Sequence, residues 1–256
     1  MKELEGNNIK YYGLTTRDYL ILKHISLNKE LTLLEIGIGT GSFVDKINGK
    51  VKKYYGVDIA CDVIDYLAYL YRDNNSLKWR CLDACHKNSS LNESFDIIFS
   101  SHTLEHVESP RGYFDFIKRH LKINGTSLVI FPNESKEKHH GITWFENKKE
   151  LLKIIEGANL QVVKFLEIKE TFWHKIIKKL LWQFPKSIIL RNKSNPQTFE
   201  KTQAFKIMQS SSIKSRFFSF YAKVITKIIV IFKPYKYFNV GDNIVNKNLF
   251  IQLKHK

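Results

Sequence analysis

The sequence predicts an α/β fold built on a doubly wound sheet of seven mostly parallel strands, the last of them antiparallel. Short apolar segments alternate with helix-length segments over residues 31–168, the pattern of a parallel sheet with helices on both faces. A glycine-rich loop follows the first apolar segment, and carboxylates follow the next two. The alternation stops at residue 169 and resumes at residues 248–254, where the last strand is expected.

This pattern divides the chain into four segments. Residues 1–30 are an N-terminal helical segment, residues 31–168 the core, residues 169–247 an insertion and residues 248–256 the final core strand. A length of 256 residues and a hydrophobic content of 43% are enough for one sizeable core with an elaboration. Because the last strand completes the core, the basic and mostly helical insertion is not a separate C-terminal domain.

The glycine-rich loop is the most informative local feature. Residues 31–36 are short, apolar and typical of a strand covered on both faces. Gly37, Gly39 and Gly41 then alternate. A residue without Cβ adopts positive φ easily and lets a ligand lie against the backbone, and the amides that begin the next helix face that ligand. We predict a ligand cradle here, although a tight strand-to-helix turn would have the same glycines.

Polar residues stand where the next three predicted strands end. Residues 54–58 end in Asp58, whose carboxylate can accept hydrogen bonds from the two hydroxyls of a ribose. A third strand, residues 77–83, ends in Asp83. A fourth, residues 95–100, ends in Ser100 and is followed by Ser-His-Thr-Leu-Glu-His-Val. The carboxyl ends of parallel strands share one sheet edge, so we expect these groups to form one site.

These motifs, in this order, resemble those of the class I S-adenosylmethionine (SAM)-dependent methyltransferases of the type 11 and type 23 kind. The resemblance covers residues 31–166 and the C-terminal strand, and it implies a Rossmann-like fold with SAM as cofactor. In this family the residues that match Asp83 and Ala84 read the adenine edge. The cofactor-binding residues that the resemblance implies are Glu35, Gly37, Gly39, Thr40, Gly41, Asp58, Ile59, Asp83, Ala84 and Ser100.

Histidines supply the candidate catalytic groups. Methyl transfer to a hydroxyl needs an oriented cofactor and, in most cases, a general base, for which histidine is well suited. His102 and His106 follow the fourth strand, and His139 and His140 follow the fifth. We predict His102, His106 and His140 as catalytic residues. His106 could instead orient its loop or cap a helix, and the histidine pair could lie in a solvated loop.

Residues 102–106 also match H-x-x-E-H, the inverted zinc-protease motif. That motif requires a helix and a third ligand, whereas here it begins at a strand end. Small-RNA 2'-O-methyltransferases, which share the fold, place metal ligands at a comparable Glu-His pair. Their pattern has a carboxylate where this chain has His102, so we expect no metal.

The insertion carries most of the net charge of +16. Residues 169–247 contain 16 Lys and Arg and three acids, against 25 and 22 in the remainder of the chain. A chain rich in Lys, Asn and Ile throughout explains many lysines but not this local shortage of acids. Within the insertion, residues 217–232 are too short and too charged to span a bilayer.

Three roles are compatible with this basic, aromatic segment. It could be a lid over the substrate, a lid that also docks on an anionic membrane, or a nucleic-acid surface. Its Ile, Leu and Val side chains do not help base stacking, which favours the membrane over RNA.

The N-terminus lacks an apolar signal-peptide segment, and Cys61, Cys81 and Cys85 form no C-x-x-C pair. We therefore expect free thiols and a cytoplasmic protein, with a peripheral position at the inner face of the membrane as an option. The expected function is SAM-dependent O-methylation of a small-molecule, sugar or lipid-linked acceptor. The alternatives are an RNA methyltransferase and a non-catalytic SAM-binding partner subunit, and the oligomeric state is left open.

Overall fold

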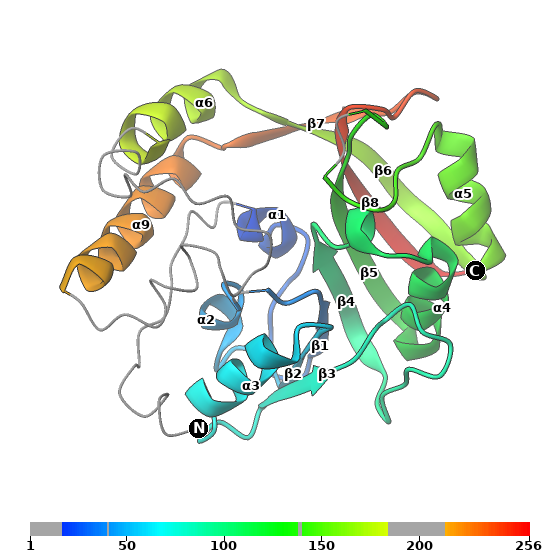
Figure 1. The fold of residues 1–256 in the computed structure, drawn as a ribbon, viewed down its shortest axis with the longest axis horizontal. Helices are drawn as coiled ribbons and strands as arrows, with labels where there is room; N and C mark the ends of the chain where they lie inside the picture. Colours follow the sequence, from blue (N-terminus) through cyan, green and yellow to red (C-terminus); the bar gives the residue numbers. More distant parts are fainter. Residues whose placement is uncertain (1–16, 40, 138–139, 184–212) are drawn as a thin grey trace. The chain divides into compact units, whose positions relative to one another are not determined.

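The computed structural model describes residues 17–39, 41–137, 140–183 and 213–256 (Figure 1). The chain separates into two compact units, and each is described by itself. One comprises Met1–Leu20 and Glu170–Lys236, and the other Ile21–Lys169 and Tyr237–Lys256. The larger unit holds the predicted core. The smaller holds the middle of the predicted insertion. No helix among the described residues is both long and apolar enough to cross a membrane.

The described strands form one mixed sheet in the order β3-β2-β1-β4-β5-β8-β6-β7. The first five strands along the chain pair in parallel, and β8 is antiparallel to both β5 and β6. The strands are β1 (Thr32–Ile36), β2 (Lys53–Asp58), β3 (Leu77–Cys81), β4 (Phe95–Ser101), β5 (Leu121–Asn133), β6 (Leu160–Glu170), β7 (Tyr235–Asn239) and β8 (Lys247–His255).

The α/β fold with an antiparallel last strand is confirmed, but the predicted number of seven strands is wrong by one. The extra strand is β7, which lies at the edge of the sheet and comes from residues assigned to the insertion. Its sequence is Tyr-Lys-Tyr-Phe-Asn, and the exposure of its side chains alternates over the first four residues. That alternation is the period of a half-exposed strand, but the adjacent aromatic residues Tyr237 and Phe238 hide it in the sequence.

The helices begin and end at recognisable signals. The helix α4 starts at Pro110 after Ser109, whose hydroxyl accepts from the Gly112 N–H at 3.0 Å, an N-cap followed by proline. Asn147 caps α5 in the same way through the Glu150 N–H at 3.0 Å. The helices are α1 (Asp18–Leu22), α2 (Val44–Ile47), α3 (Cys61–Leu70), the 3₁₀ turn η2 (Leu104–His106), α4 (Pro110–His120), α5 (Lys148–Gly157), α6 (Phe172–Lys178), the π-helix η3 (Lys179–Gln183) and α9 (Ile213–Ile231).

Helices cover both faces of the sheet in the larger unit, with α4 and α5 on one side and α2 and α3 on the other (Figure 1). All five residues of β1 are buried, as expected for a central parallel strand. Leu34 and Ile36 join the core cluster that includes Phe114 of α4, whereas Phe99 of β4 packs on Phe43 just before α2. This packing fixes the strand ends at which the candidate site lies.

Candidate cofactor and acceptor site

The glycine loop between β1 and α2 has the backbone that the sequence predicts. Gly37, Gly39 and Gly41 have φ values of 75°, 50° and 70°, in the left-handed region. A Cβ on Gly37 would lie 2.1 Å from Thr103 Oγ1, so that position is closely packed. Around a Cβ on Gly39, no heavy atom of the described residues would lie within 4 Å. The loop therefore exposes its backbone to open space at Gly39, as a ligand cradle requires.

Asp58 is fixed at the end of β2 by two backbone amides. Its Oδ2 accepts from the Gly39 N–H at 3.0 Å, and its Oδ1 accepts from the Ala60 N–H at 3.0 Å. Each carboxylate oxygen has a second lone pair, so the group can still accept two hydrogen bonds. The donors that match are the vicinal hydroxyls of a ribose lying over the glycine loop.

An exposed apolar side chain follows the end of β2, and an exposed carboxylate follows the end of β3. The side chain of Ile59 is 71% exposed directly after Asp58, and an exposed aliphatic side chain beside a polar clamp suits a stacked planar ring. The exposed Asp83 accepts from the Cys85 N–H at 2.8 Å, while Ala84 is buried. These residues therefore fit an adenosine.

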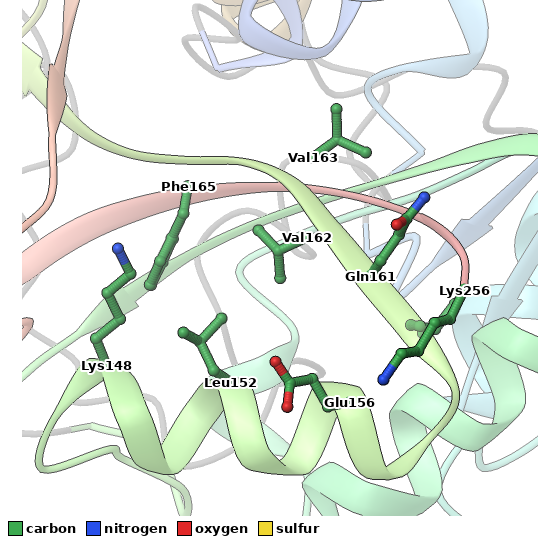
Figure 2. A pocket seen from close by; sticks show the side chains of 9 residues that line it. Lys148, Leu152, Glu156, Gln161, Val162, Val163, Phe165 and Lys256 are labelled. Atoms are coloured by element: carbon green, nitrogen blue, oxygen red, sulfur yellow. The ribbon is translucent and has the colours of Figure 1, made fainter.

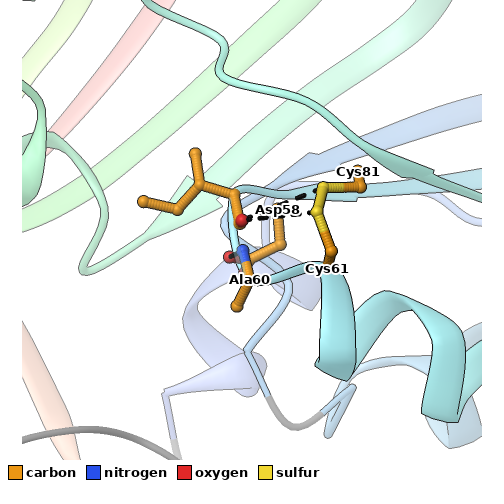
Figure 3. Close-up of a disulfide and its surroundings, with 5 residues drawn as sticks. Asp58, Ala60, Cys61 and Cys81 are labelled. Atoms are coloured by element: carbon orange, nitrogen blue, oxygen red, sulfur yellow. Dashed lines mark hydrogen bonds between the residues drawn. A yellow bond between two sulfur atoms is a disulfide. The ribbon is translucent and has the colours of Figure 1, made fainter.

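A disulfide joins Cys61 and Cys81 beside this surface (Figure 3). The prediction of free thiols is wrong for these two residues. Cys81 pairs with Asp58 across β2 and β3, and α3 begins at Cys61, so the two Cα atoms come within 5.0 Å. Both sulfur atoms lie 3.8 Å from the carbonyl oxygen of Ile59. Cys85 is a free thiol, and burial raises its pKa to about 11.

Two predicted cofactor residues are bound to tyrosines. Glu35, buried in β1, accepts a hydrogen bond from the Tyr54 hydroxyl. The Ser100 hydroxyl is hydrogen-bonded to that of Tyr113, and both side chains are fully buried. The register could have revealed the first pair, because Glu35 pairs with Gly56, two residues from Tyr54. Nothing in the sequence indicates the hydrogen bond between Ser100 and Tyr113. Thr40 lies outside the described residues.

The three predicted catalytic histidines line one cavity of about 190 Å³, here called the histidine cavity. It lies where β4 and β5, neighbouring parallel strands, reach their carboxyl ends. The residues that line it are His102, Glu105, His106, Pro132, Glu134, His140, Gly141 and Thr143. His139 lies outside the described residues.

Within the cavity, His140 is paired with Glu134, a residue that the sequence analysis missed. Glu134 Oε2 lies 2.8 Å from His140 Nδ1 and accepts from the His140 backbone N–H at 3.0 Å. A neutral imidazole that donates from Nδ1 keeps the lone pair of Nε2 for a proton. The signal that could have found Glu134 is its place directly after Pro132 and Asn133, at the end of the fifth strand.

The walls of the cavity are joined through Glu105. Its carbonyl oxygen accepts from the N–H groups of Ile142 and Thr143 at 2.7 and 3.0 Å, and a Cβ on Gly141 would lie 2.0 Å from the same oxygen. The loop after β5 is therefore packed directly on η2. On the other side, Thr103 Oγ1 donates to the carbonyl of Ile36 at 3.0 Å, which links the same turn to the glycine loop.

His102 and His106 make other contacts, and the side chain of His140 is itself 87% exposed despite its pairing with Glu134. His102 has a φ of 61°, and its N–H donates to the carbonyl of Ile130 at 2.8 Å. His106 Nε2 lies 3.9 Å from Glu105 Oε1, and its side chain is 55% exposed. Throughout the described part of the chain, no group of three or more His, Cys, Asp or Glu residues has an arrangement that could hold a metal ion.

A second cavity, of about 450 Å³, lies between α5 and β6 (Figure 2). Lys148 Nζ sits 5.2 Å from the centre of the Phe165 ring at one end, and Leu152 and Val162 form part of an apolar floor. No predicted cofactor or catalytic residue lines this cavity. The smaller histidine cavity, beside the glycine loop, is therefore the candidate reaction site.

Comparison with known proteins bears on the family and the fold. Residues 34–129 match the family described as a methyltransferase domain. Malonyl-[acyl-carrier protein] O-methyltransferase 2 of Ilyobacter polytropus is 29% identical over 124 residues, which are 48% of this chain and 44% of that protein. The chain thus matches less than half the length of this curated relative.

Two solved structures show the same fold over nearly the whole chain. The [4+2]-cyclase SpnF is 13% identical, with a TM-score of 0.58 over 96% of this chain and 87% of that one. A phosphoethanolamine N-methyltransferase 2 of Haemonchus contortus is 17% identical, with a TM-score of 0.55 over 99% of this chain and 56% of that one. Taken with the family match over residues 34–129, the shared fold supports a class I S-adenosylmethionine-dependent methyltransferase domain, with S-adenosylmethionine as its cofactor.

Proposed function

We propose that this chain transfers the methyl group of SAM to a hydroxyl oxygen of a small-molecule, sugar or lipid-linked acceptor in the histidine cavity. The observation that carries the proposal is the His140–Glu134 pair, with 2.8 Å between Nδ1 and Oε2. This is the arrangement of a general base held by a carboxylate. Its cavity adjoins the glycine loop through Thr103, so an acceptor bound there lies on the cofactor side of the sheet.

Each residue has a defined task in this mechanism. When bound, SAM supplies a methyl group that its sulfonium already makes electrophilic. His140 Nε2 takes the proton of the acceptor hydroxyl as the oxygen–carbon bond forms and the carbon–sulfur bond breaks. Glu134 keeps the imidazole in the tautomer that donates from Nδ1 and stabilises the imidazolium that results. The glycine loop and Asp58 hold the adenosine end in place, which aligns the reacting atoms.

The size of the cavity bears on the acceptor class. At about 190 Å³ it is smaller than the roughly 300–1,000 Å³ of pockets that enclose a drug-sized ligand. We therefore propose that the cavity receives only the hydroxyl-bearing end of the acceptor. A sugar hydroxyl or the polar end of a lipid-linked molecule has this form, with the remainder of the molecule outside the cavity.

The test uses purified protein, methyl-labelled SAM and a cleared lysate, separated into butanol-soluble, small aqueous and RNA fractions. We expect label in the butanol or the small aqueous fraction. In His140→Gln the rate should fall by about 10²–10⁴ because the base is lost, with the Kd for SAM unchanged. Glu134→Gln should lose less, because the imidazole remains.

The matched control is His255→Gln, at a histidine on β8 that hydrogen-bonds the Leu121 carbonyl away from the cavity. It should retain the wild-type rate. Label recovered in RNA would contradict the proposed acceptor class. An unchanged rate in His140→Gln would contradict the assignment of the base, and His102→Gln and His106→Gln would then be the next variants to measure.

A further inference from the structure

The smaller unit exposes large apolar side chains that methyl transfer does not use. Six of them are at least half exposed, and together they are here called the insertion surface. They are Phe172, Trp173, Leu180, Phe220, Ile231 and Phe232, with exposures of 70%, 63%, 62%, 66%, 76% and 50%. Large apolar groups gathered in this way mark a surface that another molecule covers.

The helix α9 is apolar on two faces. Ile225 and Ile229, one turn apart, are buried at 4% and 0% exposure and form its packed face. Phe220, Val224 and Ile231 follow one another at helical spacing on the exposed face, and the exposed Lys227 lies in the same row. A helix at the surface of a water-soluble unit has a polar outer face, so the outer face of α9 is suited to an apolar environment.

The helix α6 adds an aromatic pair to this surface. Phe172 and Trp173 lie at its first turn, with their ring centres 5.7 Å apart. The Thr171 N–H donates to the carbonyl of Pro234 at 2.9 Å, which brings the start of α6 next to the end of α9. The start of α6, which carries the aromatic pair, is therefore close to the chain that follows α9, and α6 and α9 lie side by side in Figure 1.

The charge of these segments defines the partner. Residues 170–183 and 213–236 contain nine Lys and Arg and one acid, Glu170. Glu170 Oε1 accepts from Lys178 Nζ at 2.7 Å, so its charge is already compensated. Each Lys or Arg near an anionic membrane is attracted to its surface charge, and aromatic side chains with lysines around them prefer the boundary between headgroups and acyl chains.

We propose that the insertion surface docks on an anionic lipid bilayer, with α6 and α9 lying in the headgroup region. The exposed face of α9 carries Val224 and Ile231 and the π-helix carries Leu180, and aliphatic side chains give lipid contact but no base stacking. A lipid surface therefore fits this face better than RNA. Docking does not depend on methyl transfer and is measured without SAM.

The experiment is co-sedimentation of the full chain with phosphatidylcholine vesicles, with and without phosphatidylglycerol, in the absence of SAM. We expect binding to the anionic vesicles that weakens as salt rises. The double variant Phe220→Ser/Ile231→Ser should lower the partition coefficient by about tenfold or more, since both substitutions remove apolar surface that docking would bury.

The matched control is Ile123→Ser, which removes an apolar side chain of 81% exposure in the larger unit. It should bind vesicles as the wild type does. Because all three residues are exposed, the variants should fold, and circular dichroism checks this. The proposal is overturned if the wild type does not sediment with anionic vesicles, or if the control loses as much binding as the double variant.

Two further outcomes would assign the insertion surface to another partner. Light scattering that shows a dimer in the wild type and a monomer in the double variant would identify a second copy of this chain. RNA that displaces the protein from vesicles and whose own binding is lost in the double variant would identify a nucleic acid. Either result overturns the lipid proposal, whereas the fate of labelled SAM leaves it unaffected.

Discussion

The backbone N–H of Gly39 donates to Asp58 Oδ2 across 3.0 Å, which ties the glycine loop to the end of β2. The loop and the carboxylate are therefore aligned with each other by the protein itself. A ligand that uses both finds the geometry already set and loses less freedom on binding. Because Gly39 and Asp58 both contribute to the cofactor site, a single substitution at either residue tests whether SAM binds there.

Replacing Gly39 with alanine should damage SAM binding more than it damages the fold. Gly39 and Gly49 have φ values of 50° and 74°, and a Cβ on either meets no heavy atom of the described residues within 4 Å. Both substitutions should therefore cost about 1–2 kcal/mol of unfolding free energy, from backbone strain alone. Only the Gly39 Cβ enters the space over the loop, so Gly39→Ala should lose about tenfold or more in SAM affinity.

Calorimetry with SAM and urea unfolding, applied to both variants, separate the two effects. Equal SAM affinity in Gly39→Ala and Gly49→Ala would show that the cofactor does not lie over the loop.

Asp58→Asn should weaken SAM binding through the ribose. The amide nitrogen that replaces one oxygen cannot accept, so either a backbone N–H or a ribose hydroxyl loses its acceptor. An unpaired buried polar group costs about 1–3 kcal/mol, which corresponds to about tenfold to a hundredfold in Kd. Asp73→Asn, at a side chain that is 93% exposed, is the control and should bind SAM normally.

A SAM analogue without ribose hydroxyls sharpens this test. It should bind wild type and Asp58→Asn with nearly equal affinity, because the hydroxyl contacts are absent in both. A full loss of affinity for the analogue as well would mean that Asp58 acts only by holding the loop.

Reduction of the Cys61–Cys81 disulfide should lower the stability of the larger unit. The bond closes a loop between residues 20 positions apart, for which the chain-entropy relation gives about 3 kcal/mol. Thermal unfolding should therefore shift to lower temperature with dithiothreitol in the wild type and should not respond to it in Cys61→Ser/Cys81→Ser. Alkylation of the unreduced protein, once denatured, should label Cys85 alone. Three labelled cysteines would contradict the disulfide.

The sequence could predict the parts of the site that depend on strand ends. Parallel strands deliver their carboxyl ends to one edge, which is why His102, His106 and His140 come together although their loops were unknown. The positive φ values at the loop glycines follow from the tight turn that Gly37 begins. Both predictions depend on the backbone alone, so they can be made without knowing any side-chain conformation.

What the sequence could not predict depends on long-range contacts. The Glu134–His140 pair exists because the loop after β5 is held on the Glu105 carbonyl, and no local pattern encodes that. The bond between Cys61 and Cys81 depends on strand register rather than spacing. The individual cofactor contacts, the acceptor and the cytoplasmic location stay predictions.

The stability of the larger unit should fall in mild acid because of His120, at the end of α4. The side chain is 4% exposed. Its Nε2 accepts from the Leu91 N–H at 3.4 Å, and its Nδ1 lies 3.3 Å from the Glu93 carbonyl oxygen, to which it can donate. A neutral imidazole satisfies both contacts, whereas protonation of Nε2 removes the acceptor for Leu91.

Burial is the main cause that lowers the pKa of His120, with the Arg119 charge acting in the same direction, and the Glu93 carbonyl opposes it. In the unfolded chain a histidine has a pKa of about 6.5. Between that value and the lower folded pKa, the unfolded chain binds more protons, so the unfolding free energy decreases as pH falls. The contribution is complete above pH of about 6.5 and is lost as the pH drops through the folded pKa.

Urea unfolding of the wild type, His120→Gln and the exposed control His86→Gln at several pH values below and above neutrality measures this slope. His120→Gln should have a shallower slope than the wild type, because glutamine can donate and accept but does not titrate. Some slope should remain, since burial also lowers the pKa of His24, which belongs to the same unit. His86→Gln should keep the wild-type slope. A His120→Gln slope equal to the wild type would contradict the prediction and place the acid sensitivity outside His120.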